Sequence, residues 1–420
     1  EPAVVAYAPG RVEILGNHTD YNEGLVLSAA IDSGTCFAVA PAGGATCRLT
    51  AGDLMREVRF EVGRPAPVRS DTWANYCLGV LAGLLPRGTF RQGFDALFFG
   101  NIPQGSGLSS SAALEVSTAL ALARLYAIEV DPISLARIAQ QAEHTFAGVK
   151  CGLLDQISSL FGRDGMLVQT DFRSLEIRHA PLGAGAVLLI CNTHAKHALV
   201  DGEYNQRRAD CEAAAAFFRT RLPHPVAALR DVSWTEWEAH RGGLDERIAR
   251  RAAHPIGENE RVVQGAERLA QGDLEGFGRL MFASHESSRR YFENSCGELD
   301  HLVDTARGVP GVLGARLSGG GFGGSVAVLV RTPDAAAASS ARARIASRTS
   351  GVISSLTAAV AALETSAPTA ACTASTTSCP ARDWTSTPKV GGCWSSTSTG
   401  WASMPGSSDG SLPQSLMTPP

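Results

Sequence analysis

The stretch Pro103-Gln104-Gly105-Ser106-Gly107-Leu108-Ser109-Ser110-Ser111-Ala112-Ala113 is the most informative segment of the chain. Its glycines let the backbone approach a ligand closely, and the apolar residues 110–126, without Gly or Pro, predict a helix directly behind them. The first turn of such a helix presents free N–H groups and a positive dipole end. A helix cap alone needs one hydroxyl, whereas this helix start has three, on Ser109, Ser110 and Ser111. The surplus favours a phosphate-binding loop over an ordinary turn.

This loop is neither of the two common nucleotide motifs. It lacks the Gly-Lys-Ser/Thr of a Walker A loop, and its glycines do not have the spacing of a Rossmann fingerprint. Strands and helices alternate irregularly on both sides of it, which predicts an α+β or mixed α/β fold. We expect strands at 3–7, 25–40, 45–62, 95–99, 186–191 and 326–330, and helices at 71–85, 110–126, 131–146, 207–221, 259–271 and 299–306.

Length and charge exclude several classes of protein. The chain has 420 residues, 44% of them hydrophobic, which is enough for two or three domains. The net charge of −4 provides no electrostatic footprint for nucleic acid or an anionic membrane, and no apolar run approaches the ~18 residues of a membrane span. The start of the chain lacks the pattern of a signal peptide, and the cysteines before residue 350 are scattered without a CxxC pair. We therefore expect reduced thiols and a cytoplasmic protein.

Residues 10–22 form a second constellation, Gly-Arg-Val-Glu-Ile-Leu-Gly-Asn-His-Thr-Asp-Tyr-Asn, which we expect to be a loop following an apolar strand. Such a density of donors and acceptors suits a polyhydroxylated ligand. A solvated loop with Asx-turns is the alternative for this stretch taken alone.

Residues 314–324 have five glycines in the last six positions, and no regular element accommodates them. The backbone there must lie against a ligand or another segment, because the apolar strands that flank it argue against a linker. A fourth feature is Glu143 and His144 followed by Asp155 and Gln156 among apolar residues. A carboxylate in such surroundings is either ion-paired or functional.

Taken together, these segments resemble the galactokinases of the GHMP small-molecule kinase superfamily. Residues 103–112 are similar to the superfamily's phosphate loop, Pro-x-Gly-x-Gly-Leu-Ser-Ser-Ser-Ala. Residues 10–22 are similar to the galactokinase signature, Gly-Arg-Val-Asn-Leu-Ile-Gly-Glu-His-Thr-Asp-Tyr-Asn, and 314–324 to a third, glycine-rich motif. The resemblance extends from residue 6 to about residue 330, and the motifs occur in the right order.

The resemblance implies a fold and an activity. The fold would have two α+β domains, at 1–170 and 171–345, with the active site between them. The activity would be transfer of the ATP γ-phosphoryl group to the C1 hydroxyl of galactose, as in Leloir-type galactose metabolism. The partners would be ATP with Mg²⁺ and a small sugar, with no nucleic acid or membrane, and the protein would be a monomer or a weak homodimer.

The resemblance also implies roles for individual residues. Asp155 would orient or deprotonate the sugar hydroxyl, and Arg11 would stabilise the ionised Asp155 and the charge on the transferring phosphoryl group. Ser111 and Glu143 would hold Mg²⁺ through oxygen atoms. The remaining implied contacts are with ATP, by Trp73, Gly105, Ser106, Gly107, Leu108, Ser109, Ser110 and Ser111, and with the sugar, by Asn17, His18, Asp20, Gly152 and Tyr204.

Asn17 departs from the signature, which has Glu before His. Asn keeps one acceptor oxygen but loses the charge, and a neutral hydrogen bond is roughly half as strong as a charge-assisted one. A kinase for another sugar, such as N-acetylgalactosamine or a pentose, is therefore an alternative. A catalytically inactive sugar and ATP sensor is a second alternative, which the intact phosphate loop, Arg11 and Asp155 disfavour.

The end of the chain differs from the rest. Residues 351–420 contain 14 Ser and 11 Thr but only five charged residues. Superfamily members end with a strand that returns to the C-terminal sheet, and no such strand is evident beyond about residue 335. We hypothesise a reading-frame shift near 335–355 that leaves 346–420 as a tail without selected structure; a genuine disordered extension is the alternative. Sequencing the coding DNA tests this, because an intact frame would contradict the shift.

Overall fold

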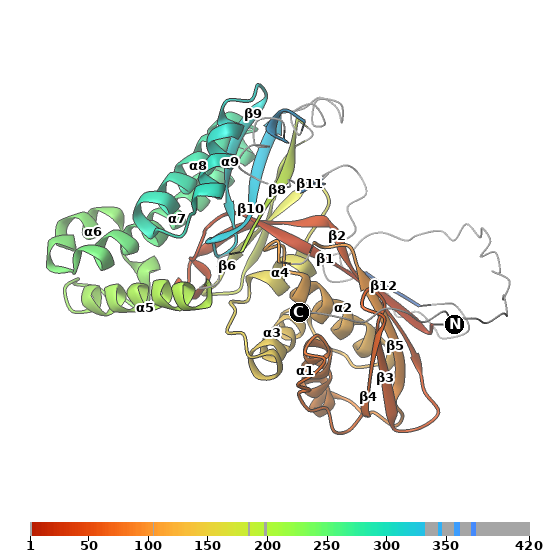
Figure 1. Cartoon of the computed structure of the whole chain (residues 1–420). Helices are drawn as coiled ribbons and strands as arrows, with labels where there is room; N and C mark the ends of the chain where they lie inside the picture. The colour runs from red at the N-terminus through yellow and green to blue at the C-terminus, as the bar shows by residue number, and fades with distance from the viewer. Residues whose placement is uncertain are drawn as a thin grey trace, which may run out of the picture.

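The computed structural model describes residues 2–103, 105–183, 185–196, 200–331, 343–346, 357–361 and 371–374. Within them the chain forms two sheets, each with helices packed against it (Figure 1). This is the α+β arrangement expected from the sequence. None of the helices in this part of the chain is long and apolar enough to cross a membrane.

The larger sheet belongs to the N-terminal half. Its central strands pair in the order β1-β2-β5-β3-β4, antiparallel except for the parallel pair β3 and β5. β6 continues the sheet along the first part of β2, and β7 pairs with β6. These strands are β1 (Val4–Leu15), β2 (Leu25–Pro41), β3 (Thr46–Ala51), β4 (Arg56–Glu61), β5 (Phe94–Gly100), β6 (Met166–Asp171) and β7 (Ile177–Pro181).

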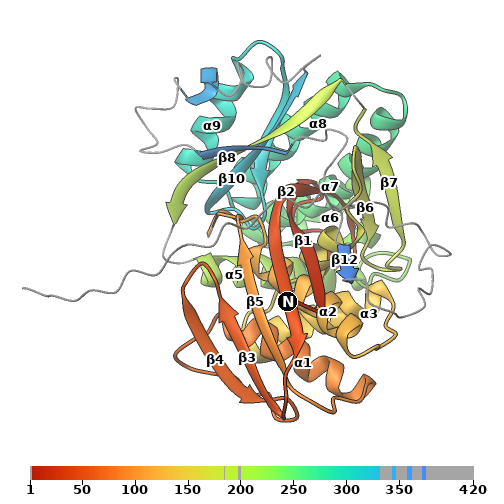
Figure 2. The same cartoon turned by 90° about the vertical axis from the view of Figure 1, so that its right-hand side faces the viewer.

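Four helices cover one face of this sheet, and Figure 2 shows the strands in front of them. They are α1 (Ala74–Leu84), α2 (Ser110–Leu125), α3 (Pro132–Ala142) and α4 (Leu154–Phe161). α2 is buried most deeply, because it packs against β1 and β2 on one side and against the other three helices on the other. Its small residues Ala112, Ala113 and Ala119 allow that close approach, and the N-terminus of the helix is thereby held at the edge of the core.

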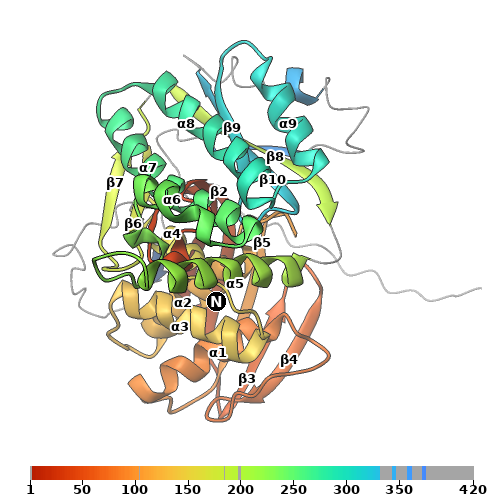
Figure 3. The same ribbon diagram turned by 90° about the vertical axis from the view of Figure 1, so that its left-hand side faces the viewer.

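The C-terminal half is built on the smaller sheet, ordered β11-β8-β10-β9 and antiparallel throughout. α8 and α9 cover one of its faces (Figure 3). The elements are β8 (Ala186–Lys196), β9 (Val312–Ser318), β10 (Gly323–Arg331), β11 (Thr357–Ala361), α8 (Leu274–Ser287) and α9 (Gly297–Arg307).

A group of helices lies at the left of Figure 1, beside the junction of the two halves: α5 (Val200–Arg219), α6 (Trp234–His240) and α7 (Glu246–Ala270). Two bidentate ion pairs attach this group to the N-terminal sheet. Arg230 contacts Asp171 at 2.5 and 2.7 Å, and Arg173 contacts Asp231 at 2.7 and 2.9 Å. The bonds from Arg230 lower the pKa of Asp171 to about 2, so this carboxylate stays charged at neutral pH.

Several elements differ in extent from the sequence-based expectation. β1 runs to Leu15 rather than to residue 7, so Arg11 and Glu13 lie on a strand and not in a loop. α7 begins at Glu246, thirteen positions before the expected start, because burial against neighbouring elements accommodates Pro255 inside the helix. A local pattern with Pro and Gly argues for a break, but tertiary packing overrides it here.

The prediction that no strand follows residue 335 was wrong for two short segments. β11 pairs with β8 from Thr357 opposite Asn192 to Ala361 opposite Leu188, and β12 (Ala371–Ala374) pairs with β1. The sequence signal is weak because alanine, which dominates both segments, has a low strand propensity, and pairing with an open sheet edge decides the structure. Apart from residue 346 and these two strands, the expected tail at 346–420 lies outside the described residues.

A stability prediction follows from the close contact between α8 and β9. A Cβ atom on Gly278 would lie 2.1 Å from the Leu313 carbonyl oxygen, a backbone atom that cannot move aside easily. We expect Gly278→Ala to lower the free energy of unfolding by about 1–3 kcal/mol. The control is Gly297→Ala, another helical glycine, with open space around its Cβ position. Urea unfolding of both variants checks this, and equal stabilities would contradict it.

Candidate active site

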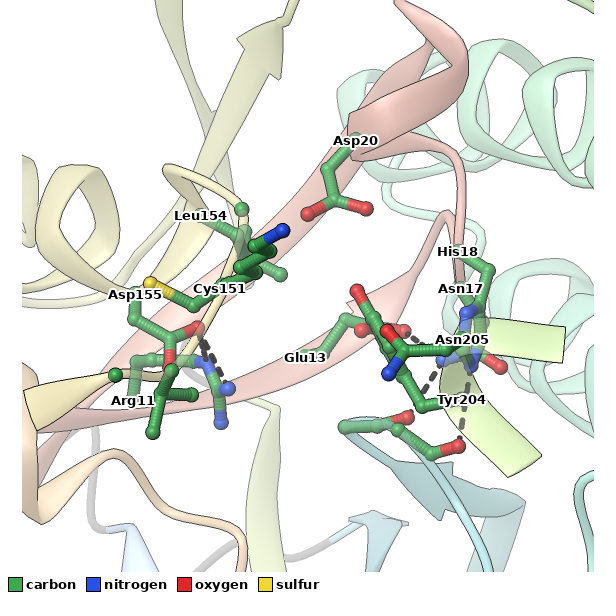
Figure 4. Close-up of a pocket in the computed structure, with 16 residues that line it drawn as sticks. Arg11, Glu13, Asn17, His18, Asp20, Cys151, Leu154, Asp155, Tyr204 and Asn205 are labelled. Atoms are coloured by element: carbon green, nitrogen blue, oxygen red, sulfur yellow. Dashed lines mark hydrogen bonds and ion pairs between the residues drawn. The ribbon is translucent and has the colours of Figure 1, made fainter. Parts of the chain in front are cut away.

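A cavity of about 550 Å³ opens where the two halves meet, and its lining comes from both (Figure 4). β1 and the following turn contribute Arg11, Glu13, Asn17, His18 and Asp20; the start of α4 contributes Asp155; α5 contributes Tyr204; and the glycine-rich turn contributes Gly319 and Gly320. A smaller adjoining cavity of about 250 Å³ is lined by Pro103 and residues 105–111. Arg11, Asp155, Gly319 and Gly320 line both cavities.

Arg11 and Asp155 form an ion pair at the boundary between the cavities. Arg11 Nε and Nη2 donate to Asp155 Oδ1 at 2.9 and 2.6 Å, and Arg11 Nη1 donates to the Gly107 carbonyl oxygen at 2.6 Å. Ser109 Oγ donates to the other oxygen, Asp155 Oδ2, at 2.5 Å. The carboxylate is therefore held in one orientation by a strand, a loop and its own helix.

The serine hydroxyls of the glycine- and serine-rich loop at 103–111 have different hydrogen-bond partners. Ser106 is buried and donates to the Pro103 carbonyl oxygen at 2.6 Å, which shapes the loop itself. Ser109 has a φ of +60°, a left-handed conformation that is unusual for a residue other than glycine, and this aims its hydroxyl at Asp155. Gly105 and Gly107 also have positive φ values, of 68° and 73°. The backbone of the loop and the first turn of α2 are left to line the smaller cavity.

Ser111 and Glu143 are close together behind the loop. Ser111 Oγ donates to Glu143 Oε1 at 3.1 Å, and the other carboxylate oxygen accepts from Cys151 Sγ at 3.1 Å and from Gln156 Nε2 at 3.2 Å. Burial raises the pKa of Glu143. A hydroxyl and a carboxylate beside a phosphate loop are the hard oxygen ligands that Mg²⁺ takes together with phosphate oxygens and water, so these residues fit that ion. The described ranges, this site included, contain no group of three or more His, Cys, Asp or Glu that could hold a metal, so phosphate oxygens and water would have to complete the coordination.

Asp20 lies across the larger cavity from Asp155 (Figure 4). A Cβ atom on Gly152 would lie 1.8 Å from Asp20 Oδ2, so a larger residue at position 152 would displace the Asp20 carboxylate. Burial raises the pKa of Asp20 to about 6, with Glu13 and Asp155 adding to the rise. This carboxylate is therefore charged only above about pH 6.

His18 lines the cavity, but both of its ring nitrogens have partners. Nε2 is 3.1 Å from the Gly320 carbonyl oxygen, an acceptor, so Nε2 carries the proton and Nδ1 accepts from the Tyr21 hydroxyl at 2.8 Å. Burial lowers the pKa of His18 to about 4, which keeps the ring neutral. The rings of Tyr204 and Phe292 pack against it, 5.1 and 4.6 Å away between centroids. His18 thus presents a ring face and edge to a ligand rather than a free nitrogen.

The glycine-rich turn lies against another segment of the protein as well as along the cavity. A Cβ atom on Gly321 would lie 2.1 Å from the Asn294 carbonyl oxygen, and its φ is +84°. The carbonyl oxygens of Gly319 and Gly320 accept hydrogen bonds from Asn17 and His18, respectively. The close approach inferred from the sequence is therefore present, and it joins the two halves.

The site residues expected from the sequence lie in or beside the two cavities, except for Trp73. Trp73 lies at the start of α1, with its ring 5.5 Å from that of Phe98 and its Nε1 donating to Asp71 at 3.1 Å. It is not among the residues that line either cavity. Sequence reasoning missed Glu13, although the alternation Arg11, Glu13 within an apolar strand was a usable signal. It also missed the buried Arg316 and Asn294, which donate to Glu13 Oε1 at 2.8 Å and to Asn17 Oδ1 at 2.9 Å and which no local pattern distinguishes.

Both halves of the chain are similar to the GHMP kinases. Residues 75–163 match the family model for the GHMP kinases N terminal domain, and 266–347 match the GHMP kinases C terminal model. Residues 1–41 match the galactokinase galactose-binding signature. The chain belongs to the galactokinase family.

Individual relatives agree with this assignment. The chain is 42% identical over 330 residues to a galactokinase of Roseiflexus sp. (strain RS-1), covering 78% of this chain and 84% of the relative. It is 43% identical over 326 residues to one of Mannheimia succiniciproducens, covering 76% and 83%. Among solved structures, Lactococcus lactis galactokinase complexed with galactose is similar, with a TM-score of 0.79, 31% identity and coverage of 85% and 92%. The Methanococcus jannaschii mevalonate kinase, at 17% identity and a TM-score of 0.60, shares the fold.

A pH dependence follows from Asp20. If its carboxylate accepts a hydrogen bond from the sugar, kcat/KM for the sugar will fall about tenfold between pH 7 and pH 5, with an apparent pKa near 6. Asp20→Asn should lower kcat/KM at pH 7 and remove this dependence. His18, neutral above about pH 4, does not titrate in that range. If kcat/KM of Asp20→Asn still falls with an apparent pKa near 6, another group causes the pH dependence.

Proposed function

We propose that this protein is an enzyme that transfers the γ-phosphoryl group of ATP to the C1 hydroxyl of galactose, giving galactose 1-phosphate and ADP. One observation carries the proposal: the Arg11–Asp155 ion pair stands where the phosphate-loop cavity meets the larger, polar cavity. A group at this boundary can touch both the acceptor hydroxyl and the phosphoryl group. The family's galactose-binding signature and the galactokinase relatives support galactose as the acceptor.

In this mechanism Asp155 orients the C1 hydroxyl and takes its proton as the oxygen attacks the γ-phosphorus. The bond between the γ-phosphorus and the bridging oxygen breaks, and ADP leaves. Arg11 holds the carboxylate in place and supplies positive charge beside the transferring group, whose transition state spreads negative charge over its oxygens. Both oxygens of Asp155 are already fixed before substrate binds, which limits the reorganisation that the reaction needs.

ATP would bind with its phosphates along residues 105–111, at the N-terminus of α2. Ser111 and Glu143 would hold Mg²⁺, which neutralises phosphate charge when bound. Ser109 has a different role from the ATP contact expected from the sequence, because its hydroxyl fixes Asp155. We therefore assign it to positioning of the carboxylate.

The alternatives are less well supported. An inactive sensor does not need an arginine and a serine that both fix one carboxylate at the cavity boundary. A kinase for a different sugar was favoured by Asn17 as a sugar ligand, but its amide is committed to protein partners. Galactose accordingly remains the first choice.

The role of Asp155 is tested by Asp155→Asn. We expect kcat with galactose to fall by about 10²–10⁴-fold, the usual contribution of general acid–base catalysis, while ATP binding changes little. The exposed Asp164→Asn is the matched control and should behave as the wild type. Steady-state kinetics with calorimetric ATP titration provide both readouts, and unchanged turnover in Asp155→Asn would rule out the assignment.

The metal site is tested by Ser111→Ala, with Ser111→Thr as the control that keeps the hydroxyl. Loss of one oxygen ligand should raise the Mg²⁺ concentration needed for half-maximal activity by about tenfold or more, and Thr should restore most of it. The measurement is a Mg²⁺ titration at fixed total ATP for each variant. If Ala and Thr behave alike, the hydroxyl does not hold the metal.

A further inference from the structure

We propose that Glu13, and not Asn17, is the residue that selects the sugar: its carboxylate oxygen Oε2 accepts a hydrogen bond from a hydroxyl other than the reacting one. This inference rests on the proposed sugar kinase function and concerns the same cavity. It reverses the sequence-based assignment of Asn17 as a sugar ligand. The reasons lie in how the two side chains share their hydrogen bonds.

The amide of Asn17 is bonded to the protein through both its nitrogen and its oxygen, and it is almost inaccessible to a ligand. Its Nδ2 donates to Glu13 Oε1 at 3.0 Å and to the Gly319 carbonyl oxygen at 2.7 Å. Because both of these partners are acceptors, they determine which end of the amide carries hydrogens. Its Oδ1 accepts from Asn294 Nδ2 at 2.9 Å, and the side chain is about 1% exposed. Asn17 is thus a clamp that ties the N-terminal turn to Gly319 and Asn294.

Only one of the two carboxylate oxygens of Glu13 accepts hydrogen bonds from the described residues. Oε1 accepts from Asn17 Nδ2 and, at 2.8 Å, from Nη1 of the fully buried Arg316. Among the described residues, no donor reaches Oε2, although Glu13 lines the larger cavity. Oε2 is also not among the buried oxygen atoms that lack a partner, so it is accessible from the cavity, where the hydroxyl of a ligand can donate to it.

The charge of Glu13 is balanced from the C-terminal half. Burial raises the pKa of Glu13, and the guanidinium groups of Arg316 and Arg11 oppose that rise. The Arg316 bond also fixes the orientation of the carboxylate, since Arg316 is held inside β9 at 0% exposure. Oε2 is therefore presented to the cavity by a side chain that cannot rotate without breaking two bonds.

The position of Glu13 indicates which part of the sugar it contacts. Glu13 and Arg11 are two residues apart on β1, so their side chains leave the same face about 7 Å apart along the strand. Arg11 holds Asp155 at the reacting hydroxyl, and Figure 4 shows Glu13 between that pair and Asn17. Glu13 consequently faces the sugar away from C1.

The sequence supports this reading independently. The galactokinase signature quoted above has Asn at the position of Glu13 and Glu at the position of Asn17. The two residues are thus exchanged here, which keeps one carboxylate and one amide in the pair. Since Asn17 Nδ2 and Glu13 Oε1 bond each other directly, the exchange moves the charge within one hydrogen-bonded unit.

The experiment compares the wild type with Glu13→Gln, Asn17→Glu and the double variant Glu13→Asn/Asn17→Glu. For each, the Kd for galactose and for its 2-, 3-, 4- and 6-deoxy derivatives is measured by calorimetry without ATP, and kcat, KM for galactose and KM for ATP are measured separately. Thermal unfolding of each variant shows whether it is folded. Glu13→Gln could destabilise the protein because it removes the charge that pairs with Arg316. The double variant keeps one carboxylate in the pair and serves as the test in that case.

We expect Glu13→Gln to weaken galactose binding by about 10–100-fold, the usual range for a hydrogen bond to a charged group, with KM for ATP nearly unchanged. One deoxy derivative, already weak for the wild type, should lose nothing further, which identifies the contacted hydroxyl. The double variant should bind galactose at least about tenfold more tightly than Asn17→Glu, where two carboxylates meet.

Equal losses for galactose and every deoxy derivative in Glu13→Gln would show a purely structural role and overturn the proposal, as would unchanged galactose binding. The proposed function fails in a different way: the wild type would bind galactose but form no galactose 1-phosphate, while the deoxy pattern still reports on Glu13.

Discussion

The carboxylate of Glu258 is the contact on which the geometry of the site depends. It lies inside α7 at 0% exposure, and Oε2 accepts from the backbone N–H groups of Gly16 and Asn17 at 2.9 and 3.0 Å and from Ser284 Oγ at 3.0 Å. Burial by itself would raise the pKa of Glu258, but the guanidinium groups of Arg261 and Arg316 outweigh it and lower the pKa. A permanently charged acceptor in the C-terminal half thus holds the turn after β1, because removing either partner would leave a buried charge or N–H groups unpaired.

This anchoring explains why many polar side chains in and beside the cavity are held in one orientation. Asn17, His18 and Thr19 follow the anchored backbone, and each makes hydrogen bonds that fix its side chain. On the other side of the cavity, Arg11 and Ser109 fix Asp155 in the same manner. The two sides are joined by Gly319 and Gly320, whose carbonyl oxygens accept from the N-terminal turn while their backbone lines both cavities. On the proposed function, the sugar and the phosphate would meet at this boundary, which is the proximity that a phosphoryl transfer between two bound substrates requires.

Similar residues in the site have different hydrogen-bond partners. Three consecutive serines open α2, yet only Ser111 faces Glu143, whereas Ser109, in a left-handed conformation, serves Asp155. Glu13 and Asn17 both lie in the stretch 10–22. Glu13 has a carboxylate oxygen that faces the cavity, whereas the Asn17 amide is hydrogen-bonded between the two halves. Identical or neighbouring residue types thus have different functions because the backbone directs them to different partners.

The motifs of the sequence were enough to indicate the galactokinase family and a helix behind the loop at 103–111, and the resemblance that they carry predicted roles for Arg11, Asp155, Ser111 and Glu143. These features are local or depend on motif order, and a loop of glycines and serines before a helix has few physical solutions. The fold was needed to reveal the hydrogen-bond partners of Asn17 and Glu13, the pairing of β11 with β8, and the contacts of Arg316, Asn294 and Glu258. Each of these depends on a partner more than 150 positions away, and hydrogen-bond capacity is assigned by proximity in space rather than by residue type.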